Sequence, residues 1–240
     1  ALEREELRAE RARTRLMEES EKLHRSLLDS VSHEFKTPIV SISGFADLLL
    51  DEDVTPEEQH EYLQIIRDES KRLAQLSGSV LLLNRIEAQT ILTDCTDFSL
   101  DEQLRQCILV TRQKWRDKPL QFEAELAPCT YHGSEALVKE IWLNLLDNAA
   151  KFSPENGIIS VTLHSEQGSP VVAVTDHGCG MDAETCRHIF EQFYQGDTSH
   201  RTQGNGLGLA MAQKIAALHG GAVTVDSRPG SGSCFTVVLK

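Results

Sequence analysis

The sequence predicts an α+β protein in two parts: an N-terminal helical hairpin and a C-terminal α/β sandwich with a mixed sheet. Two observations predict this. Up to about residue 90, apolar residues recur at steps of three and four, the period of one helix face. From about Ile91 onward, short β-branched runs alternate with helical segments. The helical part is divided further into an N-terminal segment and the hairpin, so we expect three regions: 1–25, 26–90 and 91–240.

The heptad pattern of the N-terminal region predicts a coiled coil that continues into the hairpin. Leu2, Ala9, Leu16 and Leu23 repeat every seven residues. A solvated charged helix is the alternative for the first turns. The apolar stripe that follows consists of Leu28, Val31, Phe35, Pro38, Ile42, Phe45 and Leu49.

The second helix of the hairpin has a strong start signal. Thr55 can cap the helix, Pro56 suits its first turn, and Glu58 completes a capping box. Its apolar stripe runs to about Ala88. One hairpin cannot bury two such seams well, so we expect a homodimeric four-helix bundle.

The C-terminal region contains two pairs of neighbouring strands. The expected strands are Ile91–Thr93, Gln121–Leu126, Ile158–His164, Val171–Thr175, Ala222–Asp226 and Cys234–Leu239. The expected helices lie near Asp101–Trp115, Ser134–Phe152, Ala183–Phe193 and Leu207–Leu218. Turns containing Gly and Ser join the third strand to the fourth and the fifth to the sixth, which favours antiparallel pairing. We expect a mixed sheet covered on one face by helices.

Composition excludes several classes of protein. The 240 residues carry 24 basic and 37 acidic side chains and a net charge of −13, which argues against a nucleic-acid surface. The six cysteines form no C-x-x-C pair and no zinc pattern, which is typical of a reducing cytosol. No apolar run approaches the roughly 20 residues that span a membrane, so we expect no direct membrane contact in this segment.

His33 is the most informative residue. At ~100° per residue, it lies opposite the direction midway between Val31 and Phe35, both in the apolar stripe. A helix that buries this stripe presents the imidazole to solvent. An exposed His followed by an acid, Glu34, is a candidate nucleophile.

A polar face is expected on the helix near Ser134–Phe152. Asn144, Asn148 and Lys151 are spaced by four and three residues and so share one face. Carboxamide oxygens suit Mg²⁺, and a nearby Lys suits phosphate. Taken alone, two Asn on a helix are more often solvated polar groups.

Two glycine-containing segments add to this pattern. Asp176 ends a strand, where it can accept a hydrogen bond from an exocyclic amine, and Gly178 and Gly180 let the chain approach a flat ring. A polar turn is the alternative interpretation.

The second segment contains Gly204, Gly206 and Gly208 and opens a helix whose backbone N–H groups can bind phosphate. The preceding stretch from Gln195 to Gln203 has the composition of a mobile lid. Within it, Arg201 is a candidate phosphate contact or an ordinary surface Arg.

In this order, the motifs resemble those of the bacterial sensor histidine kinases of two-component signalling. Ser32–Pro38 is similar to the phosphoacceptor box of that family, and Asn144–Ser153 to its asparagine box. Asp176–Gly180 and Gly204–Leu209 match its two glycine boxes, and Phe190–Phe193 matches its phenylalanine box.

Two features refine this resemblance. Gln192 and Gln195 occupy positions where the family often has Arg, which puts phosphate contacts there in doubt. The segment Glu21–Leu28 is similar to potassium-responsive sensor kinases.

The resemblance implies roles in phosphoryl transfer for the hairpin. His33 would be phosphorylated, and Glu34 would take a proton from its imidazole. Thr37 would help to orient a water that dephosphorylates the partner. Region 1–25 would be a signalling helix, and 26–90 the dimerisation and histidine phosphotransfer domain.

For the remainder of the chain, the resemblance implies the ATP-binding fold shared by histidine kinases, gyrases and chaperones, with ATP and Mg²⁺ as cofactors. Asn148 would bind Mg²⁺ with Asn144 beside it. Lys151 and Arg201 would contact phosphates, and Asp176 would bind adenine. Region 91–240 would thus be the catalytic ATP-binding domain.

The implied partners are a second copy of the chain and the receiver domain of a response regulator, whose Asp takes the phosphoryl group. No nucleic acid is expected. The implied location is the cytoplasm, with a tether to the inner face of the membrane through an absent N-terminal region.

Two other functions compete with this one. The first is an ATP hydrolase of the same nucleotide-binding fold, which would need a Glu as water-activating base where this chain has Asn144. An amide cannot accept that proton, so Asn144 favours transfer to His33. The second is a dimeric docking scaffold with an inactive nucleotide site. The presence of His33, Asn148, Asp176 and the glycines argues against it.

Overall fold

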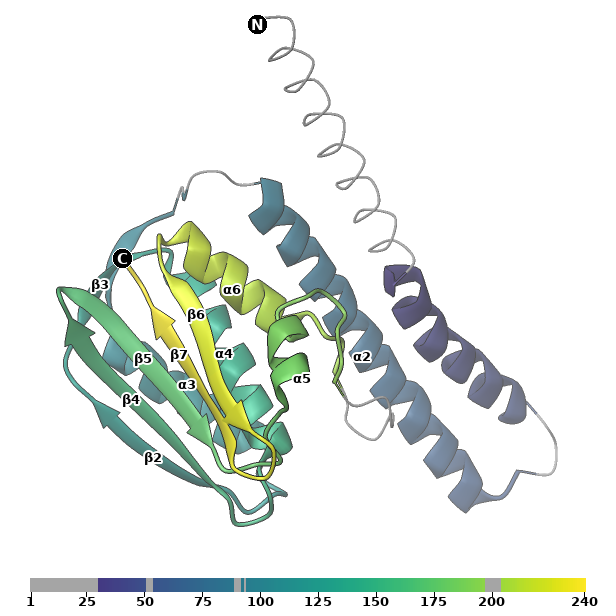
Figure 1. The fold of residues 1–240 in the computed structure, drawn as a ribbon. Coiled ribbons are helices and arrows are strands. Elements are labelled where there is room, and N and C mark those ends of the chain that lie inside the picture. The colour runs from purple at the N-terminus through teal and green to yellow at the C-terminus, as the bar shows by residue number, and fades with distance from the viewer. Residues whose placement is uncertain (1–29, 51–53, 89–91, 93, 197–203) are drawn as a thin grey trace, which may run out of the picture. The chain divides into compact units, whose positions relative to one another are not determined.

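The computed structural model describes residues 30–50, 54–88, 92, 94–196 and 204–240 (Figure 1). The chain divides into two compact units, Ala1–Gly78 and Ser79–Lys240. The predicted coiled coil of residues 1–25 lies outside the described residues. Among the helices that are described, none combines the length and apolarity needed to cross a bilayer.

The first unit contains a helical hairpin, as predicted. A helix at residues 30–48 is followed by the long helix α2 (Pro56–Ala88), which continues into the second unit. The expected capping box is present: the Glu58 N–H donates to Thr55 Oγ1 at 3.3 Å, and the Thr55 N–H donates to Glu58 Oε2 at 3.0 Å. Across the hairpin, the rings of Phe45 and Tyr62 lie 5.3 Å apart.

Large apolar side chains remain exposed on a single copy of this unit. Their exposed fractions range from 42% at Leu48 to 82% at Leu50, and the set is Ile39, Val40, Leu48, Leu50 and Leu63. Such a concentration of exposed apolar side chains is typical of an interface.

The second unit is built on a mixed five-stranded sheet with the strand order β2-β4-β5-β7-β6. Its strands are β2 (Gln121–Leu126), β4 (Ile158–Glu166), β5 (Ser169–Asp176), β6 (Ala222–Arg228) and β7 (Gly232–Val238). β2 and β4 are parallel, and all other neighbours are antiparallel. The two predicted antiparallel pairs, β4 with β5 and β6 with β7, are confirmed.

Helices cover one face of this sheet (Figure 1). They are α3 (Leu100–Lys114), α4 (Glu135–Phe152) and α6 (Gly208–Leu218). α4 lies between the other two and packs on β5. Leu145 and Leu146 of α4 are fully buried, as are Ile159 and Val172 of the sheet. Burial of this apolar stripe leaves the opposite face of α4 free for polar chemistry.

Some predicted elements differ from the structure. A two-stranded sheet of β1 (Thr96–Ser99) and β3 (Thr130–Gly133) was not predicted, because both strands are short and polar. The expected strand at 91–93 is not supported, since Leu92 is in no regular element and its neighbours lie outside the described residues. α5 (Ala183–His188) ends five residues earlier than expected, and residues 189–193 form turns in which Phe193 has a positive φ of 63°.

The bulky Trp142 of α4 has a clear structural role. It is fully buried, and its Nε1–H donates to Gln103 Oε1 of α3 at 2.9 Å. Gln103 in turn donates to the Glu135 carbonyl at 2.8 Å. These bonds satisfy the buried indole and fix α3 against α4.

His219 fixes the start of α4. Its Nε2 accepts the Ser134 N–H at 3.2 Å, and its Nδ1 is 2.8 Å from the Ile215 carbonyl, so the neutral ring donates there. The side chain is buried, and burial lowers the pKa of His219. Protonation would remove the acceptor of the Ser134 amide.

We expect this histidine to make stability pH-dependent. Because the folded-state pKa of His219 lies below the unfolded value of about 6.5, the unfolded chain binds more protons in that window. The contribution of His219 to the free energy of unfolding should therefore fall as the pH drops below about 6.5 and be constant above it. Denaturant titrations between pH 5 and pH 8 measure this. His219→Ala should lower the free energy of unfolding by about 1–3 kcal/mol and make it less dependent on pH. An unchanged pH dependence in this variant would contradict the assignment to His219. His164→Gln, which replaces an exposed histidine, is the control.

Candidate active site

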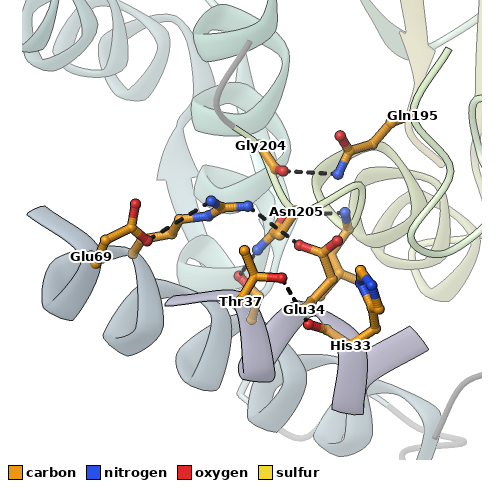
Figure 2. A network of polar contacts seen from close by, with 10 residues as sticks. His33, Glu34, Thr37, Glu69, Gln195, Gly204 and Asn205 are labelled. Atoms are coloured by element: carbon orange, nitrogen blue, oxygen red, sulfur yellow. Dashed lines mark hydrogen bonds and ion pairs between the residues drawn. The ribbon is translucent and has the colours of Figure 1, made fainter. Parts of the chain in front are cut away.

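His33 lies on the helix at residues 30–48 with its side chain exposed, as the apolar stripe predicted (Figure 2). Val31 and Phe35, which flank it in the stripe, are partly buried. An exposed imidazole on a helix is accessible to a bulky phosphoryl donor.

Two neighbours of His33 have polar partners. The Thr37 Oγ1–H donates to the His33 carbonyl at 3.3 Å, one turn earlier in the helix. Glu34 Oε2 lies 3.5 Å from an Arg72 guanidinium nitrogen of α2 (Figure 2). The Glu34 side chain thus lies between the imidazole-bearing helix and a cation on the neighbouring helix of the same unit.

The second unit contains a cavity of about 470 Å³. This volume lies in the range of small-molecule and cofactor sites. Eight of the predicted site residues line it: Asn144, Asn148, Lys151, Asp176, Gly180, Gly204, Gly206 and Gly208. The structure thus brings together three segments that are far apart in the sequence.

The polar face of α4 forms one side of this cavity. Asn144, Asn148 and Lys151 all line it, which confirms the predicted shared face. The Asn144 amide donates to the Glu140 carbonyl at 2.8 Å, so its oxygen is the group turned toward Gly208. The cavity therefore receives an amide oxygen rather than a carboxylate at this position.

Asp176, at the end of β5, is buried. Its Oδ1 accepts the Gly178 N–H at 2.8 Å, and burial raises the pKa of this carboxyl above its ordinary value. Gly180 has φ +64°, and a Cβ there would collide with the Arg228 carbonyl. Gly178 does not line the cavity, but a Cβ there would collide with the Phe152 carbonyl. Both glycines therefore permit close packing around the carboxylate.

The two chain segments that flank residues 197–203 are joined by hydrogen bonds. The Phe193 N–H donates to the Gly206 carbonyl at 2.9 Å, and the Gln195 amide donates to the Gly204 carbonyl at 3.0 Å (Figure 2). Gly206 has φ +65°, a conformation that glycine adopts without strain. A Cβ on Gly204 would lie 2.8 Å from Lys151 Nζ, so this glycine lets the ammonium approach the backbone.

Gln192 and Gln195, at the positions where the resemblance led us to expect arginine, form hydrogen bonds within the second unit. Gln195 donates to Gly204, as above, and Gln192 donates to Glu87 Oε1 at 3.0 Å. Glu87, near the end of α2, also pairs with Lys214 of α6. Both side-chain amides therefore donate hydrogen bonds within the second unit.

Two family models match the chain. The His Kinase A (phospho-acceptor) domain matches residues 23–89. The histidine kinase-, DNA gyrase B- and HSP90-like ATPase matches residues 133–240. These two models occur here in one chain, with His33 in the first and the cavity residues in the second. The chain belongs to the sensor histidine kinases of two-component signalling.

Individual sensor kinases resemble the chain over most of its length. The heme sensor protein HssS of Staphylococcus saprophyticus is 34% identical over 91% of this chain and 47% of its own length. The sensor-like histidine kinase SenX3 of Mycobacterium tuberculosis is 31% identical over 91% and 54%. The chain thus spans about half the length of these curated relatives. Full-length ShkA, solved in complex with AMPPNP, is 28% identical with a TM-score of 0.67, covering 89% of this chain and 45% of ShkA.

Several residues of this sensor kinase cavity were missed by sequence reasoning. Apolar side chains contribute much of its wall, namely Phe152, Met181, Ile189, Leu209 and Phe235. In the sequence, such residues cannot be told from ordinary core positions. Asp147 also lines the cavity, where its Oδ1 accepts from Lys114 Nζ at 2.7 Å and from Trp115 Nε1 at 2.8 Å. Arg201 lies outside the described residues.

The kinase cavity fits a magnesium nucleotide by its chemistry. Its apolar wall suits a base, and the Asn and Lys side chains suit phosphates and a hard cation. Among the described residues, no cluster of three or more His, Cys, Asp or Glu could hold a metal by itself. Mg²⁺ commonly takes only one or two protein ligands and completes its shell with phosphates and water.

Proposed function

We propose that this sensor kinase region transfers the γ-phosphoryl group of ATP to His33, and then to an Asp of a response regulator receiver domain. The observation that carries the proposal is the exposed imidazole of His33 in a chain whose second unit holds a nucleotide-sized cavity. In the first step, a bond forms between an imidazole nitrogen and phosphorus, the bond from phosphorus to the bridging oxygen breaks, and ADP leaves.

Within the cavity, we assign the residues as follows. Asp176 accepts a hydrogen bond from the adenine amine, aided by the close packing at Gly178 and Gly180. Asn148 holds Mg²⁺, with Asn144 beside it, while Lys151 and Arg201 contact phosphates. Gly204, Gly206 and Gly208 present backbone N–H groups to the phosphates. Bound there, Mg²⁺ would neutralise negative charge on the phosphates.

On the hairpin, Glu34 takes the proton that the imidazole loses as the new bond forms. Glu34 directly follows His33 in the helix, and its carboxylate forms no covalent bond in this step.

The residue at position 144 favours transfer of the phosphoryl group to His33 over hydrolysis of ATP. An ATP hydrolase of this fold would need a carboxylate at residue 144 to activate water. The chain has Asn144, whose amide is bonded to the Glu140 carbonyl. Without a base at this place, water attack lacks assistance, and His33 remains the nucleophile.

The partners follow from the hairpin and from the family. We propose that two copies associate through the exposed apolar side chains at Ile39, Val40, Leu48, Leu50 and Leu63 to form a four-helix bundle. We keep the division into 1–25, 26–90 and 91–240 as a proposal. The cytoplasmic location and membrane tether, and the potassium-responsive subfamily, stay predictions.

Incubation with ATP labelled at the γ position tests the proposed function. We expect label on the protein that is lost in acid and retained in base, as a phosphoramidate requires. Release of free phosphate without labelled protein would favour the hydrolase. The absence of both would favour an inactive scaffold.

Thr37 offers a test of an additional phosphatase role. We propose that its hydroxyl, one turn beyond His33, orients the water that dephosphorylates the regulator. Thr37→Ala should slow regulator dephosphorylation about tenfold or more while leaving labelling of His33 intact. Thr37→Ser, which keeps the hydroxyl, is the matched control. Dephosphorylation of the regulator at the wild-type rate by Thr37→Ala would remove Thr37 from this role.

A further inference from the structure

Arg72 of α2 forms ion pairs with two acidic side chains of the first unit, Glu34 and Glu69, both labelled in Figure 2. One guanidinium nitrogen is 3.5 Å from Glu34 Oε2, and the other is 3.9 Å from Glu69 Oε2. Glu34 is on the helix at residues 30–48, whereas Glu69 precedes Arg72 by one turn on α2 itself. The guanidinium therefore joins the two helices of the hairpin at the level of the phosphoacceptor.

All three side chains are substantially shielded from solvent. Their exposed fractions are 22% for Glu34, 32% for Arg72 and 24% for Glu69. Glu69 Oε2 is a buried atom that has no hydrogen-bond partner among the described residues. A cation between two shielded carboxylates is held more firmly than one on an open surface, since water competes less for each charge.

Glu34 makes no hydrogen bond to the His33 imidazole among the described residues, and its hydrogen bond is with Arg72. The Glu34 carboxylate is thus directed toward a cation 38 positions away in sequence, at 3.5 Å. The planar guanidinium reaches both carboxylates at once, with one nitrogen directed to Glu34 and the other to Glu69.

We propose that Arg72 is a positioning residue that keeps the Glu34 carboxylate on the His33 side of the hairpin, ready to accept the imidazole proton. This inference rests on the proposed function. Glu34 remains the group that takes the proton, and Arg72 acts only through it. Glu69 holds the opposite side of the guanidinium and limits its movement.

The test compares Arg72→Gln and Arg72→Lys with wild type in autophosphorylation kinetics over a range of ATP concentrations. We expect Arg72→Gln to lower kcat about tenfold with KM for ATP unchanged, because the cavity for ATP is not altered. Arg72→Lys should recover part of the rate, since it keeps the charge but lacks the second nitrogen that lies near Glu69. Arg67→Gln is the matched control: it removes a cation from the same helix whose ion pair is with the adjacent Asp68. It should behave as wild type.

A double-mutant cycle with Glu34→Gln separates positioning from general damage to the hairpin. If Arg72 acts through Glu34, Arg72→Gln should have no further effect on kcat in the Glu34→Gln background. Equal effects in both backgrounds would overturn the proposal, as would a wild-type kcat in Arg72→Gln. A wild type that carries no label on His33 would instead refute the proposed function itself. The two failures are therefore distinguishable.

Discussion

His33→Gln is expected to abolish the acid-labile phosphoryl label completely. Gln has a similar length and polarity but no nucleophilic nitrogen, so the acceptor is lost while the helix is retained. Since the side chain is exposed, the change in the free energy of unfolding should stay within about 0.5 kcal/mol. Filter-bound radioactivity after incubation with γ-labelled ATP measures the result.

His60→Gln is the matched control for this substitution, because His60 is also an exposed histidine of the same unit. It should retain the full label. Label that survives in His33→Gln would identify a different acceptor. Comparison of melting temperatures checks that both variants are folded.

Asn148→Asp should lower the rate of labelling of His33 by about 100-fold or more. Asn148 lines the cavity from the polar face of α4, and the new carboxylate would place a negative charge beside the triphosphate. The initial rate of His33 labelling at saturating magnesium and ATP measures the effect. An unchanged rate would show that the magnesium assignment is wrong.

Asn156→Asp serves as the control, since it makes the same chemical change at an exposed position that does not line the cavity. Nucleotide binding can be followed separately through Cys179, an exposed thiol that lines the cavity. Peptide mass spectrometry after alkylation should show ATP slowing modification of Cys179 in wild type, with weaker protection in Asn148→Asp. The particle mass from light scattering should be the same for both proteins.

The helical part of the fold could be predicted because its signals are local. The capping box at Thr55 and Glu58 marks the start of α2, and the stripe around Val31 and Phe35 implies the exposure of His33. The shared face of Asn144 and Asn148 likewise follows from helix geometry alone.

Other features depend on contacts that a sequence does not encode locally. β1 and β3 are four-residue, mostly polar strands whose pairing joins residues 31 to 37 positions apart, from Ser99 with Thr130 to Thr96 with Gly133. α5 ends at His188 although apolar residues continue past it, and the turns at residues 189–193 have no clear signal in the sequence. Within the candidate site, Ile189 and Phe235 line the cavity, but the sequence does not distinguish them from ordinary core residues. No periodic pattern in the sequence predicts the ion pair between Glu34 and Arg72.

The most direct test of phosphoryl transfer to an exposed imidazole is to locate the phosphoryl group on the wild-type protein. The protein, incubated with magnesium and ATP, would be digested at neutral to basic pH and sequenced by electron-transfer fragmentation. The account predicts that the modification lies on His33, in an N–P linkage that mild acid removes. Phosphate found only on hydroxyl side chains, or on a histidine elsewhere in the chain, would contradict it.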